Sequence, residues 1–185
     1  KALTLQSSQS PERISDVVKM IDLIFFSTGI IGGEFPAKKI INRIPDLVKK
    51  LRTDQNKFVW FKAASALMTT DTRPKVAYEE TKIGNKLIKI SGVAKGSGMI
   101  APNMATMGAI IFTDANIPSV FLKSILKKVT ATTFNAISVD GDQSTNDSVF
   151  LFSTSKVKHG KIYNVLDPKL QDFEKALHRL CLNLA

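Results

Sequence analysis

Residues 75–93 read KVAYEETKIGNKLIKISGV, and this stretch decides the fold. Two runs rich in β-branched and aliphatic residues flank Gly84 and Asn85, a pair that favours tight two-residue turns. The pattern predicts a hairpin over 75–93. An apolar run at 109–113 then predicts a buried strand.

Helical patterns precede the hairpin. A capping serine and a first-turn proline predict a helix over 10–26, whose apolar residues recur at helical spacing. Pro36 opens a second predicted helix, and Pro45 should end or kink it because proline lacks a backbone N–H. A third helix is expected around 58–68.

Further elements follow the hairpin. Pro118 opens a predicted helix, 136–139 and 148–154 read as strands, and Asp167 with Pro168 begins the last helix. Strands and helices occur in blocks rather than in strict alternation, which favours an α+β layered architecture over a doubly wound sheet. The last helix should bury Leu170, Phe173, Leu177, Leu180 and Leu184.

Composition is that of an ordinary globular protein, with 44% hydrophobic and 23% charged residues. The net charge is +10, but the lysines are scattered singly and in pairs, so we expect a solvated surface and no nucleic-acid or membrane role. A single cysteine, Cys181, fits a reducing, cytoplasmic setting. The start at Lys1 and the end at Ala185 within a helical pattern suggest a piece of a longer protein.

Several common catalytic patterns are missing. The two histidines, His159 and His178, lie late in the chain and away from any nucleophile motif, so a Ser-His-Asp triad is disfavoured. Cys181 falls beside the apolar face of the last helix and reads as core. No cluster of His and Cys has zinc spacing, and no Walker pattern is present.

The polar loop 140–147 resembles a calcium loop only superficially. Its sixth position is Thr145 rather than glycine, and its twelfth is Leu151 rather than glutamate, so an EF-hand is rejected. We expect a turn in which Asp and Asn side chains bond the local backbone.

Residues 92–108 read GVAKGSGMIAPNMATMG, a stretch of small residues with a single lysine. Taken alone, it could be a phosphate-binding nest or a tight turn. Three other stretches stand out beside it: STGIIG at 27–32, MTTDT at 68–72 and SVDGDQSTND at 138–147.

These four blocks, in this order, resemble the ornithine acetyltransferase (glutamate N-acetyltransferase) family of arginine biosynthesis. The resemblance implies a layered α/β sandwich with mixed sheets covered by helices. It also implies that 1–185 is part of one catalytic domain, which cuts itself between Ala105 and Thr106 into 1–105 and 106–185. Family members are longer at both ends, and Gly108 stands where the family pattern has leucine.

The resemblance also implies roles for individual residues. Thr106 would be the nucleophile, and it would carry the acetyl group as an ester. Thr28 and Gly29 would form the oxyanion hole. Thr69 and Lys95, together with Thr106, would bind substrate. Cleavage would free the α-amine of Thr106, which has a pKa of roughly 7.7–8.0 and can serve as general base.

The implied substrates are N-acetylornithine and glutamate, with acetyl-CoA as a further acetyl donor in some family members. The resemblance implies no resident cofactor or metal, and an assembly of two α and two β chains. Three alternatives stay open: a self-cleaving threonine-type aminopeptidase or amidase, a non-catalytic anion-binding module, and an inactive fragment.

Overall fold

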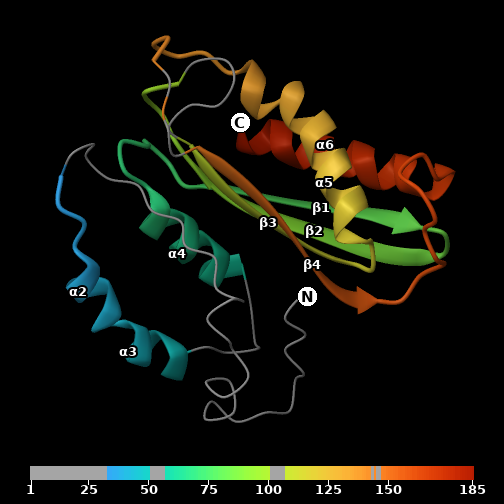
Figure 1. The fold of residues 1–185 in the computed structure, drawn as a ribbon, viewed down its shortest axis with the longest axis horizontal. Coiled ribbons are helices and arrows are strands. Elements are labelled where there is room, and N and C mark those ends of the chain that lie inside the picture. Colours follow the sequence, from blue (N-terminus) through green and yellow to red (C-terminus); the bar gives the residue numbers. More distant parts are fainter. Residues whose placement is uncertain (1–32, 51–56, 101–106, 143, 145–146) are drawn as a thin grey trace. The chain divides into compact units, whose positions relative to one another are not determined.

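The computed structural model divides into two compact units, Leu3–Asn56 and Lys57–Ala185, which are described separately (Figure 1). The helix predicted over 10–26 lies outside the described residues. The structure describes 33–50, 57–100, 107–142, 144 and 147–185.

The first unit contains two short helices, α2 (Ala37–Ile41) and α3 (Ile44–Lys49). Pro45 was expected to end or kink a single helix, but the break comes before it. Pro45 lies in the first turn of α3, where its missing N–H leaves no hydrogen bond unmade. Neither helix contains a buried residue.

The second unit is built on a four-stranded mixed sheet in the order β1-β2-β3-β4, with helices on both faces. β1 pairs with β2 and β2 with β3 in antiparallel fashion, whereas β3 and β4 run parallel. This confirms the predicted α+β class. The strands are β1 (Lys75–Ile83), β2 (Lys86–Lys95), β3 (Gly108–Ala115) and β4 (Ser148–Val157).

The hairpin prediction is confirmed. Ile83 pairs with Lys86, so the connection is the two residues Gly84 and Asn85. Gly84 has a φ of +59°, a conformation that costs glycine little because it has no Cβ.

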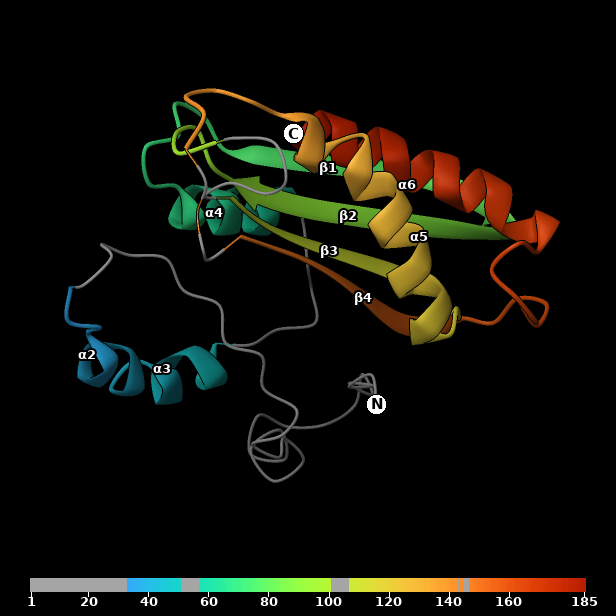
Figure 2. The same cartoon turned by 45° about the horizontal axis from the view of Figure 1, so that its top comes forward.

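Helices α4 (Lys57–Leu67), α5 (Ser119–Ala131) and α6 (Gln171–Leu184) cover the sheet. Successive strand residues point to opposite faces. On one face Phe112 meets Trp60 of α4 edge to face, with ring centroids 5.7 Å apart. On the other face Ile111 lies beside α6, so α4 and the pair α5 and α6 form layers on opposite sides (Figure 2).

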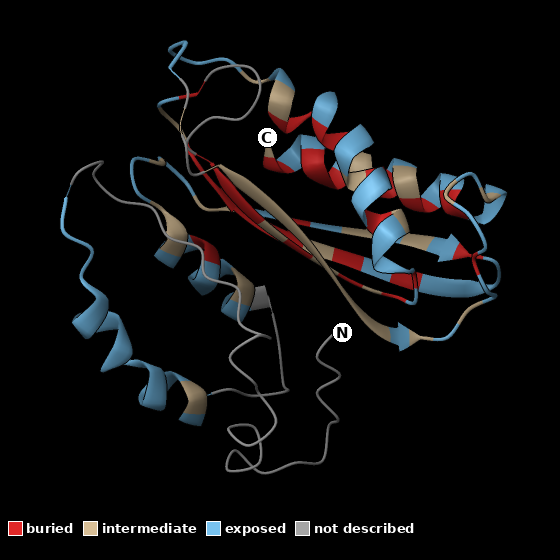
Figure 3. Ribbon diagram, in the orientation of Figure 1, coloured by how far each residue is buried: buried red, intermediate tan, exposed pale blue. Residues whose placement is uncertain are grey.

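The core lies between the sheet and the pair α5 and α6, where buried residues line the inner sides of both helices (Figure 3). At the packing surface, a Cβ on Gly92 would come 2.8 Å from Leu184, so the absence of a side chain lets α6 approach β2 closely. All the inner positions predicted for the last helix are buried, and Cys181 is buried as expected.

A strand predicted at 136–139 is wrong. The chain forms a short 3-10 helix, Phe134–Ala136, and continues as a loop. The backbone N–H of Val139 donates to the carbonyl of Ile100 instead of entering the sheet, and β4 already occupies the free edge of β3. Within the described part of the chain, no helix is long and apolar enough to cross a membrane.

Candidate active site

The turn after α4 is joined to the end of β2 by the carboxylate of Asp71. Its Oδ1 accepts the backbone N–H of Gly96 at 2.6 Å, and its Oδ2 accepts that of Thr69 at 3.2 Å. The hydroxyls of Thr70 and Ser97 lie 2.9 Å apart and add a second bond between the same segments. The fold therefore brings together two stretches that lie 27 residues apart in the chain.

Lys95 is the last residue of β2 and is only 2% exposed. Its side chain is therefore buried, although a lysine in a glycine-rich stretch would be expected to lie in solvent. Burial lowers the pKa of the Lys95 ammonium, while the carboxylates of Asp71 and Asp147 act in the opposite direction. A buried ammonium between two carboxylates is a compact charge at a set position.

Asp147 precedes β4 and contacts the residue just before β3. Its Oδ1 accepts the backbone N–H of Met107 at 2.8 Å, and the N–H of Ser148 donates to the carbonyl of Met107 at 3.2 Å. Burial raises the pKa of the Asp147 carboxyl, against the effects of the Met107 N–H and the Lys95 charge. Its other oxygen, Oδ2, is buried and has no hydrogen-bond partner among the described residues.

Asp140 contacts the chain on the other side of segment 101–106. Its Oδ2 accepts the N–H of Met99 at 2.6 Å, and its Oδ1 accepts that of Ile100 at 2.7 Å. These backbone bonds, that of Met99 first, lower the pKa of the Asp140 carboxyl. Asp142 also donates its N–H to Oδ1 at 3.3 Å, so the expectation that aspartates bond the local backbone here is confirmed.

Four predicted site residues, Thr28, Gly29, Ala105 and Thr106, lie outside the described residues. Of the other two, Thr69 donates its N–H to Asp71, and Gly96, the residue after Lys95, donates to the other oxygen of the same carboxylate. Thr69 is exposed. The substrate-binding roles of both residues stay predictions.

Sequence reasoning gave Asp71 no role, and it expected Asp140 and Asp147 only to bond their local backbone, whereas these three carboxylates connect the site. Each belongs to one of the blocks that carried the family resemblance. Their position within those blocks was the signal that could have singled them out. Their partners could not be found in this way, because they lie 25 to 41 residues away in the chain.

A cavity of about 10 Å³ lies beside Lys95, Ile100, Met107 and Phe134. This volume is just enough for one water molecule. Larger hollows of about 350 and 390 Å³ lie along α6, and neither touches a predicted site residue. Among the residues that the structure describes, no three His, Cys, Asp or Glu are arranged to hold a metal ion.

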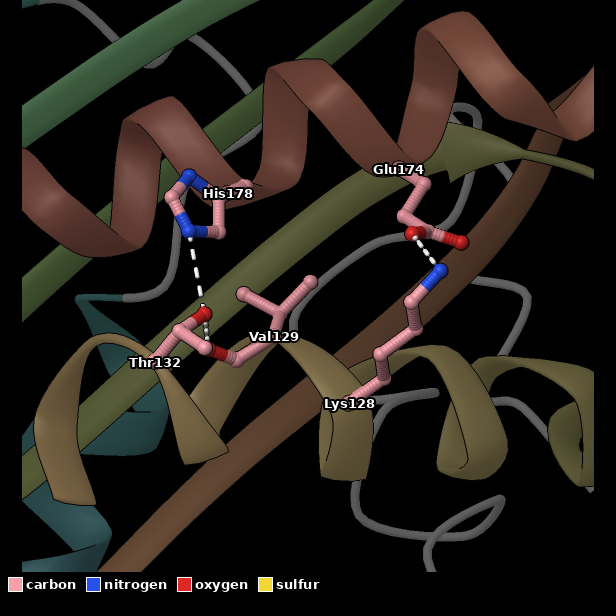
Figure 4. Close-up of polar contacts among 5 residues, drawn as sticks. All are labelled: Lys128, Val129, Thr132, Glu174 and His178. Atoms are coloured by element: carbon pink, nitrogen blue, oxygen red, sulfur yellow. Dashed lines mark hydrogen bonds and ion pairs between the residues drawn. The ribbon is translucent and has the colours of Figure 1, made fainter.

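The hollow of about 390 Å³ is lined by residues on or next to α5 and α6, among them Lys128, Thr132, Glu174 and His178, whose contacts Figure 4 shows. Lys128 and Glu174 form an ion pair across it at 2.5 Å, and the Thr132 hydroxyl lies 3.1 Å from Nε2 of His178. The other histidine, His159, accepts the N–H of Asn116 through Nε2. Both histidines thus take part in contacts outside the four blocks that define the site.

Comparison with known proteins extends the sequence pattern over nearly the whole chain. The model of the ArgJ family matches residues 6–185. The "Arginine biosynthesis bifunctional protein ArgJ" of Caulobacter vibrioides is 44% identical over 164 residues, which are 89% of this chain and 40% of that protein. The proteins of the same name from Gluconobacter oxydans and Neisseria meningitidis serogroup B are 43% and 45% identical. They match 89% and 86% of this chain, and 38% of their own length in each case. The chain thus spans about two fifths of the length of these curated relatives.

Proposed function

The chain belongs to the ArgJ family, and from this premise we propose that it is part of an acetyltransferase of arginine biosynthesis. The enzyme moves the acetyl group of N2-acetyl-L-ornithine to L-glutamate through an ester on Thr106. The relatives whose name refers to arginine biosynthesis support this assignment. Because they are longer than this chain, we expect the rest of the substrate site to come from segments beyond it.

The position of the proposed cleavage carries the assignment. The bond between Ala105 and Thr106 falls in the connection between β2 and β3, two strands that pair from Ile90 with Thr113 to Lys95 with Gly108. A cut at this bond leaves the two strands hydrogen-bonded in one sheet. The products 1–105 and 106–185 would therefore stay together as one folded unit, part of one catalytic domain.

The self-cleavage chemistry needs only Thr106 and a water molecule. The Thr106 hydroxyl oxygen attacks the carbonyl carbon of Ala105, and the peptide C–N bond breaks as the nitrogen takes up a proton. Water then hydrolyses the resulting ester. The products are the carboxylate of Ala105 and a Thr106 with a free hydroxyl and a free α-amine.

In the transfer reaction the α-amine of Thr106 takes the proton of its own hydroxyl, directly or through one water. The hydroxyl oxygen attacks the acetyl carbonyl, and Thr28 and Gly29 stabilise the oxyanion. Loss of one such donor costs on the order of 10²–10³ in rate. The amide C–N bond breaks as the ornithine nitrogen takes up that proton from the α-amine, and ornithine leaves. The amine of glutamate then attacks the acetyl ester, and its proton returns to the Thr106 oxygen as N-acetylglutamate is released.

Lys95 and Thr69 would hold the substrate. We assign Lys95 to a substrate carboxylate, because a buried ammonium at the end of a strand is held in place and weakly screened. Thr69 would hydrogen-bond the substrate backbone. No metal or resident cofactor enters this scheme. Acetyl-CoA would be a second acetyl donor. The assembly would contain two α and two β chains. It would be located in the cytoplasm.

The first experiment is a denaturing intact mass of the complete gene product. We expect wild-type protein to appear as two pieces divided between Ala105 and Thr106, and Thr106→Ala to stay uncut. Thr106→Ser keeps a hydroxyl at the same position and should still cleave, which separates loss of the nucleophile from loss of the fold. An uncut wild type, or a Thr106→Ala protein that cleaves, would refute the proposal.

The second experiment separates a transferase from a hydrolase. Cleaved enzyme is incubated with N-acetylornithine with and without glutamate, and ornithine and N-acetylglutamate are measured; acetyl-CoA replaces N-acetylornithine in a parallel reaction. A transferase forms N-acetylglutamate in step with ornithine. Release of ornithine and acetate at the same rate without glutamate would identify an amidase instead.

A further inference from the structure

The loop that joins the Phe134–Ala136 turn to β4 contacts both ends of segment 101–106. At the first end the contacts are reciprocal. Asp140 accepts the N–H groups of Met99 and Ile100 at 2.6 and 2.7 Å. The carbonyl of Ile100 in turn accepts the N–H of Val139 at 2.7 Å, with the N–H groups of Asp140 and Gly141 at 3.3 and 3.4 Å.

This first contact holds an unfavourable backbone conformation. Met99 has a φ of +57°, in the left-handed region that residues with a Cβ rarely adopt. Such residues persist only where their surroundings determine the backbone, and they are frequent at functional sites. The carboxylate of Asp140, which accepts the N–H of Met99 itself, supplies that constraint.

The second end is held by Asp147. Its Oδ1 binds the N–H of Met107, and Met107 follows Thr106 directly in the chain. Its other oxygen, Oδ2, is buried without a partner in the described part of the chain, and the Lys95 ammonium is the charge that compensates it. A buried carboxylate with an unused oxygen is unfavourable for stability. Such a group is better explained by function than by the fold.

We propose that Asp140 and Asp147 are positioning residues for self-cleavage and acetyl transfer by Thr106, because they hold the backbone that flanks segment 101–106, at Met99 and Ile100 on one side and at Met107 on the other. This inference rests on the proposed function. Asp140 and Asp147 lie on the same loop, so a single segment sets both ends. After cleavage Asp147 orients the new N-terminus through Met107, and Asp140 keeps the end of the first chain bound to the second.

The test compares self-cleavage rates of the complete gene product carrying Asp140→Ala or Asp147→Ala. Misplacement of reacting groups by about 1 Å costs on the order of 10²-fold in rate, and we expect a loss of this size from each. Asp147→Asn keeps a side-chain oxygen that can accept the N–H of Met107, so it should cleave close to the wild-type rate. Asp140→Asn keeps one acceptor oxygen for the N–H groups of Met99 and Ile100, so it should recover only part of the lost rate.

Asp114→Ala is the matched control. Asp114 accepts the N–H of Lys89 at 2.8 Å, a bond of the same kind and length as that between Asp147 and Met107. The bond of Asp114 joins β2 to β3, the two strands that segment 101–106 connects, and it lies at the end of this strand pair away from that segment. Asp114→Ala removes a carboxylate-to-backbone bond and should lower the melting temperature, but it should leave the cleavage rate unchanged.

The outcomes separate this inference from the proposed function. If wild type is cut and Thr106→Ala is not, the nucleophile is established. Asp140→Ala and Asp147→Ala proteins that then cleave at the wild-type rate would overturn the positioning role alone. The positioning role would also be overturned if Asp114→Ala lowered the cleavage rate too, and if the fall in rate in all three alanine variants followed the fall in melting temperature. An uncut wild type would remove the proposed function and the positioning role together.

Discussion

The carboxylate of Asp71 accepts the backbone N–H of Gly96 at 2.6 Å and thereby joins the turn after α4 to the end of β2. The same carboxylate acts more strongly than that of Asp147 in raising the pKa of the Lys95 ammonium against the effect of burial. One side chain thus fixes the backbone beside the predicted substrate-binding lysine and also balances the charge of that lysine.

Asp71→Ala should therefore weaken both the fold and substrate binding. Hydrogen bonds to a charged group contribute about 1.5–3 kcal/mol each, so the free energy of unfolding should fall by at least this amount. Lys95 would lose its main counter-charge, and the KM for N-acetylornithine should rise more than kcat falls. Thermal melts and steady-state kinetics of the complete gene product test this. Asp71→Asn keeps one acceptor oxygen, which can take the N–H of Gly96 or that of Thr69 but not both, and it loses the charge, so it should restore part of the stability and less of the KM.

Gly92→Ala should disturb the packing of α6 on the sheet. The added Cβ would lie 2.8 Å from Leu184, 3.1 Å from Leu180 and 3.3 Å from Ile111, and all three side chains are buried. Overpacking of this kind costs about 1–3 kcal/mol in the free energy of unfolding, measurable by urea denaturation.

Gly160→Ala is the control for that substitution. Its Cβ would meet only the end of the Lys169 side chain at 3.8 Å, and the change in stability should stay within about 0.5 kcal/mol. If Gly92→Ala and Gly160→Ala lowered the free energy of unfolding by the same amount, α6 would have adapted to the added carbon at position 92.

Cys181 should make stability fall at alkaline pH. Burial raises the pKa of its thiol from 9.0 to about 12. Between these values the folded state keeps the proton and the unfolded state loses it. The contribution to stability is therefore complete below about pH 9 and is lost as the pH rises toward about 12. For one proton the slope reaches about 1.4 kcal/mol per pH unit.

The measurement is a series of urea denaturation curves between pH 8 and 10.5 for wild type and Cys181→Ala. Titrating lysines affect both proteins alike, so the difference between the two curves isolates the thiol. We expect the variant to be less stable at pH 8, because a buried side chain is truncated, and the gap to narrow as the pH rises. A gap that stays constant with pH would mean that the thiol ionises alike in both states.

Local patterns determined much of this fold in advance. The hairpin at Gly84 and Asn85 follows from turn chemistry and from runs of strand-forming residues, and both are properties of neighbouring residues. The inner face of α6 follows in the same way from apolar residues at helical spacing. The four ordered blocks also identified the family before any contact was known.

Two local interpretations failed, each for its own reason. Residues 136–139 have the composition of a strand, yet Val139 bonds Ile100, because the edge of β3 is already taken by β4. Pro45 begins a helix where it was expected to end or kink one. The partner of Val139 lay outside the residues whose pattern was read, whereas the helix break fell inside them, at Asn42 and Arg43, just before the proline expected to cause it.

The sequence by itself predicted the four strands of the sheet, the helices that cover it, the family and the position of the proposed scissile bond, since these depend on the order and kind of adjacent residues. Only the tertiary structure decided that Lys95 is buried and that Asp71, Asp140 and Asp147 hold the backbone around it. A carboxylate finds its backbone donor through the packing of whole strands and loops. Contacts made across 25 to 41 residues of chain leave no periodic trace in the sequence.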